Sequence, residues 1–529
     1  MKAKKRNILS ILLVLLIVIT AGCSGSNETG GQEGNDESTT TGGTLIVGAT
    51  GDPQTFNPDA RADDYYYAMA QNIFSRLVKI NNNQEIIPDL AKEWEFNEEG
   101  TEITFHLQEN VKWHDGEDFS SADVKFTLDS IMEKSGYAVG NLSSMEEVTT
   151  PDENTVVIHL KKPDASFLGY LAWYATFIVP EHIYSGDNWD SGLNINPVGT
   201  GPFKFVEHTP GVSVTLERFD DYFGQVAKMD KVVFSIMSDV DTMMQAFYNG
   251  ELDVLGTSPP SSEIQNVLND ENYVANPVVW PSRQYLVFNM EEKPLDQLEV
   301  RQAIAYALDS DDIVNRALRG EGQVATSFVS PVFKWAVSDE YTVPEYDPEK
   351  AKGLLEEAGL KPDANGNYLS LTLDVFQDPG TVDMATVIKD QLRKVGIEIK
   401  LNVSEYPTWQ EQVHTNRKYQ LSMIGGYQGP DIGAISARIS TEGSNNFNGY
   451  SNPELDELLE KGASLVTEED RKPIYNEVQR ILSEDLPIYL ISEWVAVSPV
   501  HVSVKGMPNT EEALPYTGFN EYNYVWIDK

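Results

Sequence analysis

Helix-like and strand-like segments alternate through the second half of this chain, and that alternation constrains the fold more than any other feature. The stretch Pro348 to Ala358 predicts a helix that ends before a glycine, and Leu371 to Phe376 predicts a buried strand. Val382 to Val395 repeats the helical pattern, and apolar residues then alternate over 397–403 as they do in a half-buried strand. The sequence therefore predicts an α/β domain in which helices pack on a sheet.

The length of the chain requires more than one such unit. At 529 residues it exceeds the size at which a single hydrophobic core stops growing, so we expect two or three lobes. Apolar residues make up 41% of the sequence, which is enough to fill those cores and excludes a disordered protein. The alternating second half is expected to form a lobe of its own.

The stretch Leu90 to Asp129 carries the sharpest local pattern in the first half. Residues 94–96 and Thr101 to Leu107 alternate apolar with polar side chains on either side of a charged turn, which predicts a β-hairpin. A polar loop follows, and Ser120 with Asp123 then forms an imperfect capping box at the start of a helix. Pattern alone gives a hairpin, a loop and a helix within an α/β domain.

The N-terminus has the composition of a targeting segment. A basic start precedes an apolar run at 8–19, and small residues lead from Thr20 to Cys23, which is the only cysteine of the chain. We therefore expect a signal peptide at 1–22, lipidation of Cys23 and a flexible tether over 23–42 that holds the protein at the outer face of a bacterial cytoplasmic membrane. Thr20 departs from this pattern, because lipobox sequences usually carry leucine there. With one cysteine, disulfides are not expected.

The charge of the chain excludes one class of partner. Its formal net charge is −43 at pH 7, whereas nucleic-acid-binding proteins present a basic stripe. We therefore expect no nucleic acid to bind. The acidity itself is explained by solubility and self-repulsion of an exported protein.

Literal strings of the sequence go further than its patterns. The strings AKEWEF, ITFHL and VKWHDGEDFSSADVKFTL within 90–129 resemble the signature region of family 5 extracellular solute-binding proteins, the oligopeptide and dipeptide receptors of ABC importers. Asp52 to Pro58, Val198 to Phe205 and the strand–helix pair over 285–309 also resemble strings of this family. The resemblance runs from about residue 44 to the C-terminus.

The resemblance implies an α/β, two-lobed periplasmic-binding-protein-like fold with hinge crossovers and an extra domain on the first lobe. Transferred to this chain, it places lobe I at 43–75, 180–288 and 498–529, the extra domain at 76–179 and lobe II at 289–497.

No catalytic signature appears in the sequence. It contains no nucleophile elbow, no metalloprotease helix, no phosphate-binding loop and no dinucleotide fingerprint. The pair His114-Asp115 invites a metal or acid–base interpretation, but a loop whose side chains bond the backbone explains it better. We expect neither an enzyme nor a resident cofactor or metal.

The resemblance implies that ligand-binding residues lie within 405–438. In the peptide-binding members this region holds aromatic pocket residues and an aspartate that pairs with the peptide amino group. Tyr406, Trp409 and Tyr427 are the candidate aromatic walls, but Gly426 stands at the position of the aspartate. Asp431 could replace it after a loop shift, and its alternative role is to cap the helix that follows.

A second group of candidates lies outside this region. Asp63 or Asp64 could receive a cationic group of the ligand, or could simply begin a helix and complement its dipole. Tyr285 and Asn289 at the predicted crossover are further candidates, and their alternative is a place in a core strand. Arg283 or Arg438 could pair with a carboxylate of the ligand, and the alternative for both is an exposed surface position.

Taken together, these observations predict a monomeric receptor that captures a small solute, expected to be a peptide, and delivers it to the permease subunits of an ABC importer. Two alternatives stay open at this point. One keeps the fold and binds an oligosaccharide, a nickel complex or an opine-like compound, and the stacked aromatics would suit a sugar. The other is a surface receptor that senses peptides.

Overall fold

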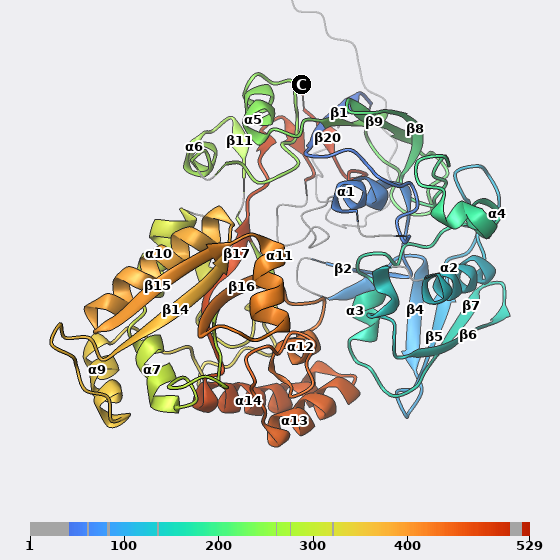
Figure 1. The fold of residues 1–529 in the computed structure, drawn as a ribbon. Helices are drawn as coiled ribbons and strands as arrows, with labels where there is room; N and C mark the ends of the chain where they lie inside the picture. Colours follow the sequence, from blue (N-terminus) through green and yellow to red (C-terminus); the bar gives the residue numbers. More distant parts are fainter. Residues whose placement is uncertain are drawn as a thin grey trace, which may run out of the picture. The chain divides into compact units, whose positions relative to one another are not determined.

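The computed structural model describes residues 42–60, 63–81, 85–134, 137–260, 262–275, 277–319, 322–507 and 521–528. Figure 1 shows how the chain folds. The signal peptide, Cys23 and the tether predicted from the sequence lie outside these residues. Among the helices that the structure describes, none combines the length and the apolar character needed to cross a bilayer.

A four-stranded sheet opens the described chain. Strand β1 (Thr44–Ala49) runs parallel to β10 (Lys231–Ile236), which continues through the antiparallel strands β9 (Ser213–Arg218) and β8 (Phe203–Thr209). Alternate residues of β1 and β9 are buried, as the period of a half-covered strand requires. Helix α1 (Asp64–Ile73) contacts β8.

A second four-stranded sheet confirms the hairpin predicted from the sequence. Strands β4 (Ala91–Phe96) and β5 (Glu102–Leu107) pair antiparallel, and the sheet continues through β7 (Thr155–Leu160) to β6 (Met145–Asp152). Helix α2 (Ser121–Glu133) begins with the expected capping box between Ser120 and Asp123. One hydrophobic cluster contains residues of both four-stranded sheets, so the two share a core.

The third sheet has six strands and a core of its own. Its order is β13 (Gly322–Val324), β17 (Ile488–Ala496), β12 (Val278–Phe288), β16 (Leu421–Tyr427), β14 (Leu369–Phe376) and β15 (Ile397–Ser404). Helices α10 (Pro379–Lys394), α9 (Pro348–Glu357) and α7 (Leu298–Tyr306) accompany these strands (Figure 1). The predicted α/β alternation of the second half is therefore confirmed.

Some elements differ from their prediction. Strand β12 extends back to Val278 and pairs with β16 and β17, although the sequence had assigned residues up to 288 to the first lobe. The apolar residues Val278 to Trp280 favour this extended conformation. After β15 the chain forms a short α-helix over Tyr406–Trp409 (α11), which continues as a π-helix over Gln410–Thr415.

The remaining elements connect or cover these sheets. They are β2 (Val78–Ile80), β3 (Ile86–Pro88), α3 (Phe167–Leu171), α4 (Glu181–Tyr184), α5 (Val240–Tyr248), α6 (Ile264–Asn269), β11 (Tyr273–Val274), α8 (Ser310–Ile313), α12 (Ser436–Ile439), α13 (Pro453–Ser464), α14 (Glu468–Asp485), β18 (Val500–His501), β19 (Val504–Lys505), β20 (Trp526–Ile527), the 3₁₀ turns η1 (Tyr137–Val139), η2 (Gly186–Asp190) and η5 (Ile432–Ile435), and the π-helical segment η3 (Val314–Leu318).

Candidate functional site

Two consecutive glycines, Gly425 and Gly426, precede the last residue of strand β16. A side chain on Gly425 would place its first carbon 2.4 Å from the side chain of Gln284. Gly426 has a φ of +132°, which L-residues rarely adopt, and a first side-chain carbon there would lie 3.9 Å from Nη2 of Arg438. Two residues of β16 next to its end therefore lack side chains, and the carbonyl of Gly426 accepts a 2.9 Å bond from the side chain of Gln428.

Arg438 is held in place by Tyr285. It lies on α12, and its Nε donates a hydrogen bond of 2.5 Å to the hydroxyl of Tyr285 on β12. Its guanidinium carbon also lies 5.8 Å from the centre of the Tyr285 ring. Tyr285 is only 3% exposed, and burial raises the pKa of its hydroxyl despite the opposing charge of Arg438. This phenol stays neutral at physiological pH and fixes the position of the arginine.

Asp431 is engaged by the protein itself. It caps the 3₁₀ turn η5 by accepting a 2.7 Å bond from the backbone N–H of Gly433. Arg471 on α14 donates two further bonds, of 2.8 and 2.6 Å, one to each carboxylate oxygen, and Ser166 donates a third of 2.9 Å. Burial alone raises the pKa of Asp431, but Arg471 and the hydrogen bonds outweigh it and hold the pKa below its ordinary value. The capping role considered from the sequence is thus present, together with an ion pair.

The segment around Asp431 joins the two large hydrophobic cores. Ser166 precedes α3 in the first half of the chain, so its bond to Asp431 crosses 265 residues of sequence. Beside it, the N–H of Ala165 donates to the carbonyl of Ala463 at 2.8 Å. At the other end of α3, Trp173 lies 6.5 Å from Trp280 of β12, measured between ring centres. The segment around α3 therefore links the first half of the chain to the second, close in sequence to the end of β16.

The predicted aromatic residues separate into one surface and one core position. The rings of Tyr406 and Trp409 stack with centres 5.8 Å apart, and Phe376 packs edge-on against both. Tyr406 is 52% exposed, whereas Trp409 is 1% exposed and donates its indole N–H to Ser422 at 3.0 Å. Tyr427 is the last residue of β16, and its side chain lies outside the described part of the structure.

Asp63 performs the structural role considered for it. It is the N-cap of α1, where its carboxylate accepts bonds from the N–H groups of Tyr66 at 3.1 Å and Gln54 at 2.7 Å. Its side chain is buried by this arrangement. Asp64 is the first residue of the same helix, and its side chain is not among those described.

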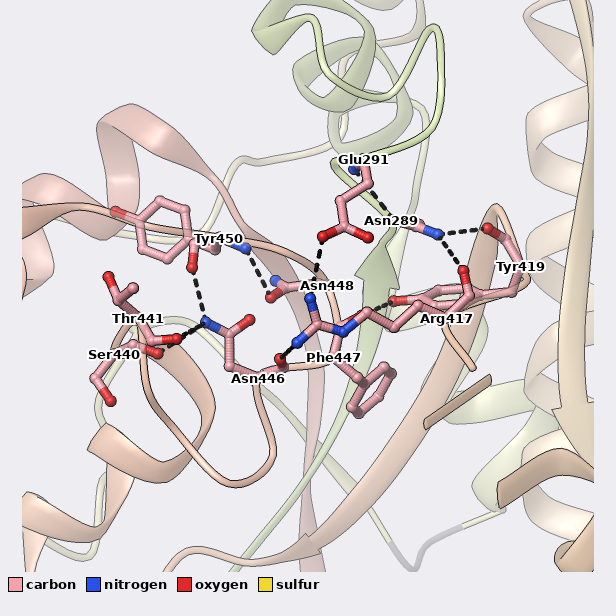
Figure 2. A network of polar contacts seen from close by, with 10 residues as sticks. All are labelled: Asn289, Glu291, Arg417, Tyr419, Ser440, Thr441, Asn446, Phe447, Asn448 and Tyr450. Carbon is pink, nitrogen blue, oxygen red and sulfur yellow. Dashed lines mark hydrogen bonds and ion pairs between the residues drawn. The ribbon is translucent and has the colours of Figure 1, made fainter. Parts of the chain in front are cut away.

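Asn289 lies in a polar network of the second half (Figure 2). Its amide nitrogen donates to the carbonyls of Arg417 and Tyr419 at 3.0 and 2.8 Å, and its amide oxygen accepts from the N–H of Glu291 at 3.1 Å. Arg417 in turn binds the carboxylate of Glu291 and the carbonyl of Asn446. These bonds tie the end of β12 to neighbouring loops, so Asn289 holds backbone in place.

Arg283 is buried, contrary to the surface position considered as an alternative. Its side chain is 2% exposed and forms a 2.6 Å ion pair with Glu493 of β17. It also donates to the carbonyls of Ser327 and Phe328 at 2.6 and 2.8 Å. Next to this pair is a narrow recess lined by Arg283, Phe328, Val329, Ser330, Phe333, Gln428, Ile432 and Ile435.

Sequence reasoning missed Arg471 and Ser166. A signal for Arg471 was present, because it shares a helical face with Ile474, Tyr475 and Val478, all of which are buried. An arginine within such an apolar stripe needs a buried partner. Nothing local marks Ser166, since its contact depends on how distant segments meet. Within the described ranges, no group of three or more His, Cys, Asp or Glu side chains is arranged to hold a metal ion.

Comparison with known proteins gives consistent matches over most of the chain. A family model described as bacterial extracellular solute-binding proteins, family 5 middle, matches residues 85–446. The dipeptide-binding protein of Escherichia coli K12 is 28% identical over 494 residues, which cover 88% of this chain and 91% of that protein.

Solved structures agree with these matches. The ABC transporter substrate-binding protein CtaP from Listeria monocytogenes matches with a TM-score of 0.81 and 28% identity, covering 92% of this chain and all of that one. AgaA from A. tumefaciens R10, solved with agropinic acid, matches with a TM-score of 0.72 and 28% identity over 92% of this chain and 99% of its own. The periplasmic-binding-protein-like α/β fold expected from the resemblance is thereby confirmed.

Proposed function

Because the chain belongs to family 5 of the bacterial extracellular solute-binding proteins, we propose that it captures a peptide and delivers it to the permease of an ABC importer. The peptide class is supported by relatives such as the E. coli dipeptide-binding protein. The matched family is one of binding proteins, and no catalytic family is indicated.

The observation that carries this proposal is the position of the end of β16. It is followed after four residues by Asp431, which bonds Ser166 of the first half, so a molecule held there would lie close to residues of both halves. Gly425 and Gly426 are partly exposed, so backbone without side chains is accessible there, and backbone groups can recognise a peptide main chain irrespective of its side chains. We propose that the solute binds at this junction.

Binding at such a junction would couple capture to a change of conformation. A ligand that contacts both halves favours the form in which they approach each other. Moving a two-state equilibrium almost wholly from one form to the other requires the ligand to bind the favoured form more tightly by about 5.5 kcal/mol, and contacts made to both halves only in the closed form supply such a difference. The permease could then distinguish loaded from empty receptor by shape.

The membrane attachment belongs to the same proposal. Residues 1–22 would be removed as a signal peptide, and Cys23 would carry the lipid that anchors a monomeric receptor to the outer face of the membrane. The residues between Cys23 and the first strand would act as the tether. This part is supported by the sequence and by the extracellular location of the matched family.

A non-peptide cargo is the second candidate. The structural likeness to AgaA, which was solved with agropinic acid, supports an opine-like compound in the same fold. The arginine beside Gly426 also suits a ligand rich in carboxylates.

Native mass spectrometry of protein purified without denaturation distinguishes these cargoes. We expect a series of bound masses that match short peptides. A single retained mass that corresponds to an opine, a glycan or a metal chelate would contradict the peptide assignment and leave the receptor function in place.

A further inference from the structure

We propose that the contact between α3 and the turn η5 is a latch that holds the two halves of the receptor together and sets how often the ligand-free protein is closed. The latch consists of Ser166 and Gly169 on one side and of Pro430, Asp431 and Gly433 on the other. This inference rests on the proposed binding function, because a latch matters only to a receptor that opens and closes. It adds a closing element that needs no ligand.

The two sides of the latch belong to different hydrophobic cores. Phe167 of α3 packs in the core of the first half, whereas Ile432 of η5 packs in the core of the second. Across the boundary, the hydroxyl of Ser166 donates a 2.9 Å bond to the carboxylate of Asp431. Each core buries its apolar residues on its own side, so parting the two sides here breaks polar bonds and pulls neither core open.

Opening the latch leaves no buried charge unpaired. Asp431 accepts two bonds from Arg471 and one from Gly433, and all three residues belong to the second half. Breaking that ion pair would be costly, but the pair moves as a unit when Ser166 withdraws. Water can then replace the serine at the carboxylate. The bond to Ser166 is therefore the reversible member of this network.

The first half presents its side of the latch in a fixed orientation. Asp164 accepts the backbone N–H of Ser166 at 3.0 Å, and its other carboxylate oxygen accepts the hydroxyl of Ser144 at 2.6 Å. Between them in sequence, Ala165 donates its N–H to the carbonyl of Ala463 at 2.8 Å. Two adjacent residues thus bond to the second half, and their pre-orientation lowers the entropy lost when the latch forms.

Small residues allow the two sides to approach closely. A side-chain carbon on Gly169 would lie 3.3 Å from Cβ of Pro430, and its three nearest atoms all belong to that proline. A side-chain carbon on Gly433 would lie 2.8 Å from Oγ of Ser166. Neither glycine has a positive φ, so the close approach, and not the backbone conformation, accounts for the missing side chain. A larger residue at 169 would act as a wedge.

These contacts predict the effect of two substitutions on the ligand-free protein. Ser166→Ala removes a hydrogen bond to a charged group, and such a bond changes an equilibrium constant by about tenfold or more. Because water replaces the serine, we expect a shift of about tenfold from closed to open. Gly169→Leu should shift the equilibrium in the same direction by driving α3 away from Pro430.

Distances between two spin labels, measured by pulsed electron paramagnetic resonance without added ligand, report this equilibrium. The labels are attached at Glu153→Cys, in the turn after β6, and at Glu460→Cys on α13, because both positions are exposed and lie in different halves. The parent protein for the measurement carries Cys23→Ala, which removes the only native cysteine. We expect a short and a long distance in the parent, and about tenfold more of the long relative to the short in Ser166→Ala.

A matched control and a second readout accompany this measurement. The hydroxyl of Ser440 bonds the carbonyl of Ser436 within the second half, so Ser440→Ala should give the distances of the parent. Circular dichroism and thermal unfolding confirm that each variant is folded. Native mass spectrometry with a tryptic digest of casein measures capture by the intact protein, and Ser166→Ala should capture less, by up to about tenfold, because its closed form is less populated.

The outcomes separate the latch from the function on which it rests. A folded Ser166→Ala with the same distances as the parent overturns the latch, and so does a parent that shows only the long distance. Either result leaves a receptor that captures peptides standing. If the wild type captures no peptide while Ser166→Ala still favours the long distance, the peptide cargo is contradicted and the latch is supported.

Discussion

Removing the guanidinium of Arg471 should destabilise the protein strongly through the carboxylate that it leaves behind. The Arg471 and Asp431 side chains are 5% and 16% exposed, and two hydrogen bonds join them. Breaking a buried pair from one side typically costs about 3–5 kcal/mol because the remaining charge is unpaired. Arg471→Ala is therefore a sensitive probe of the contact next to the proposed site.

The contacts of Asp431 place the expected destabilisation by Arg471→Ala toward the lower end of that range. Asp431 would keep its bonds from Gly433 and Ser166, and it is slightly exposed, so part of its charge stays solvated. Against this, Arg471 also donates its Nε to the carbonyl of Gly462, and that bond contributes about 1 kcal/mol. We expect a loss of about 3–4 kcal/mol in the free energy of unfolding.

Urea unfolding followed by tryptophan fluorescence measures this loss. Arg480→Ala is the matched control, because it lies on the same helix and its ion pairs are with exposed partners, so it should unfold like the wild type. Adding Asp431→Asn to Arg471→Ala should recover part of the loss, because no buried charge then remains. A loss below about 1 kcal/mol, or two substitutions whose effects simply add, would refute the reasoning.

The pH dependence gives an independent check. The folded pKa of Asp431 lies below its ordinary value, so its ionisation contributes stability at neutral pH that is lost as the pH falls through the folded pKa. The difference between the wild type and Arg471→Ala should therefore be largest near neutrality and shrink in acid. A difference that grows on acidification would contradict the assignment.

Three further predictions concern other parts of the chain. His114 accepts a bond from the Gly199 N–H on Nδ1, and burial lowers its pKa to about 4, so the imidazole stays neutral in the folded protein. Between about pH 6.5 and 4 the wild type should therefore lose about 2 kcal/mol more stability than His114→Gln, measured by urea unfolding. Trp409→Phe removes the bond to Ser422 and part of a buried ring, so the free energy of unfolding should fall by about 1–2 kcal/mol in the same assay. An unchanged stability would place Trp409 outside the core. Cys23→Ala should shift the protein from the membrane fraction to the medium on immunoblots, and retention at the membrane would contradict the lipid anchor.

The local structure of the chain could be predicted because its causes are local. The hairpin of β4 and β5 follows from alternating side chains around a turn, and the start of α2 follows from Ser120 and Asp123, three residues apart. By contrast, the sheet that β12 joins could not be predicted, because an apolar strand carries no information about which sheet it pairs with. Only the register with β16 and β17 decides that question.

The candidate site was less predictable because its determining contacts are long-range. Asp431 and Arg471 are 40 residues apart, and Ser166 is 265 residues from Asp431. A capping role for Asp431 could be considered from its neighbours, but the ion pair that neutralises it could not. Whether the charge of Asp431 is available to a ligand therefore depends on the folded arrangement and cannot be read from the sequence.

The glycine at 426 shows how such a string can mislead. Read alone, a glycine in place of a carboxylate removes an interaction and leaves nothing for a ligand. In the fold, the same glycine pairs with Arg283 of β12, and the turn η5 and helix α12 bring Arg438, twelve positions further along, back beside β16. The hydroxyl of Tyr285 holds Arg438 in that position. Distant parts of the chain therefore supply the groups around position 426, so the consequence of one changed residue for binding follows from the fold and not from the local string.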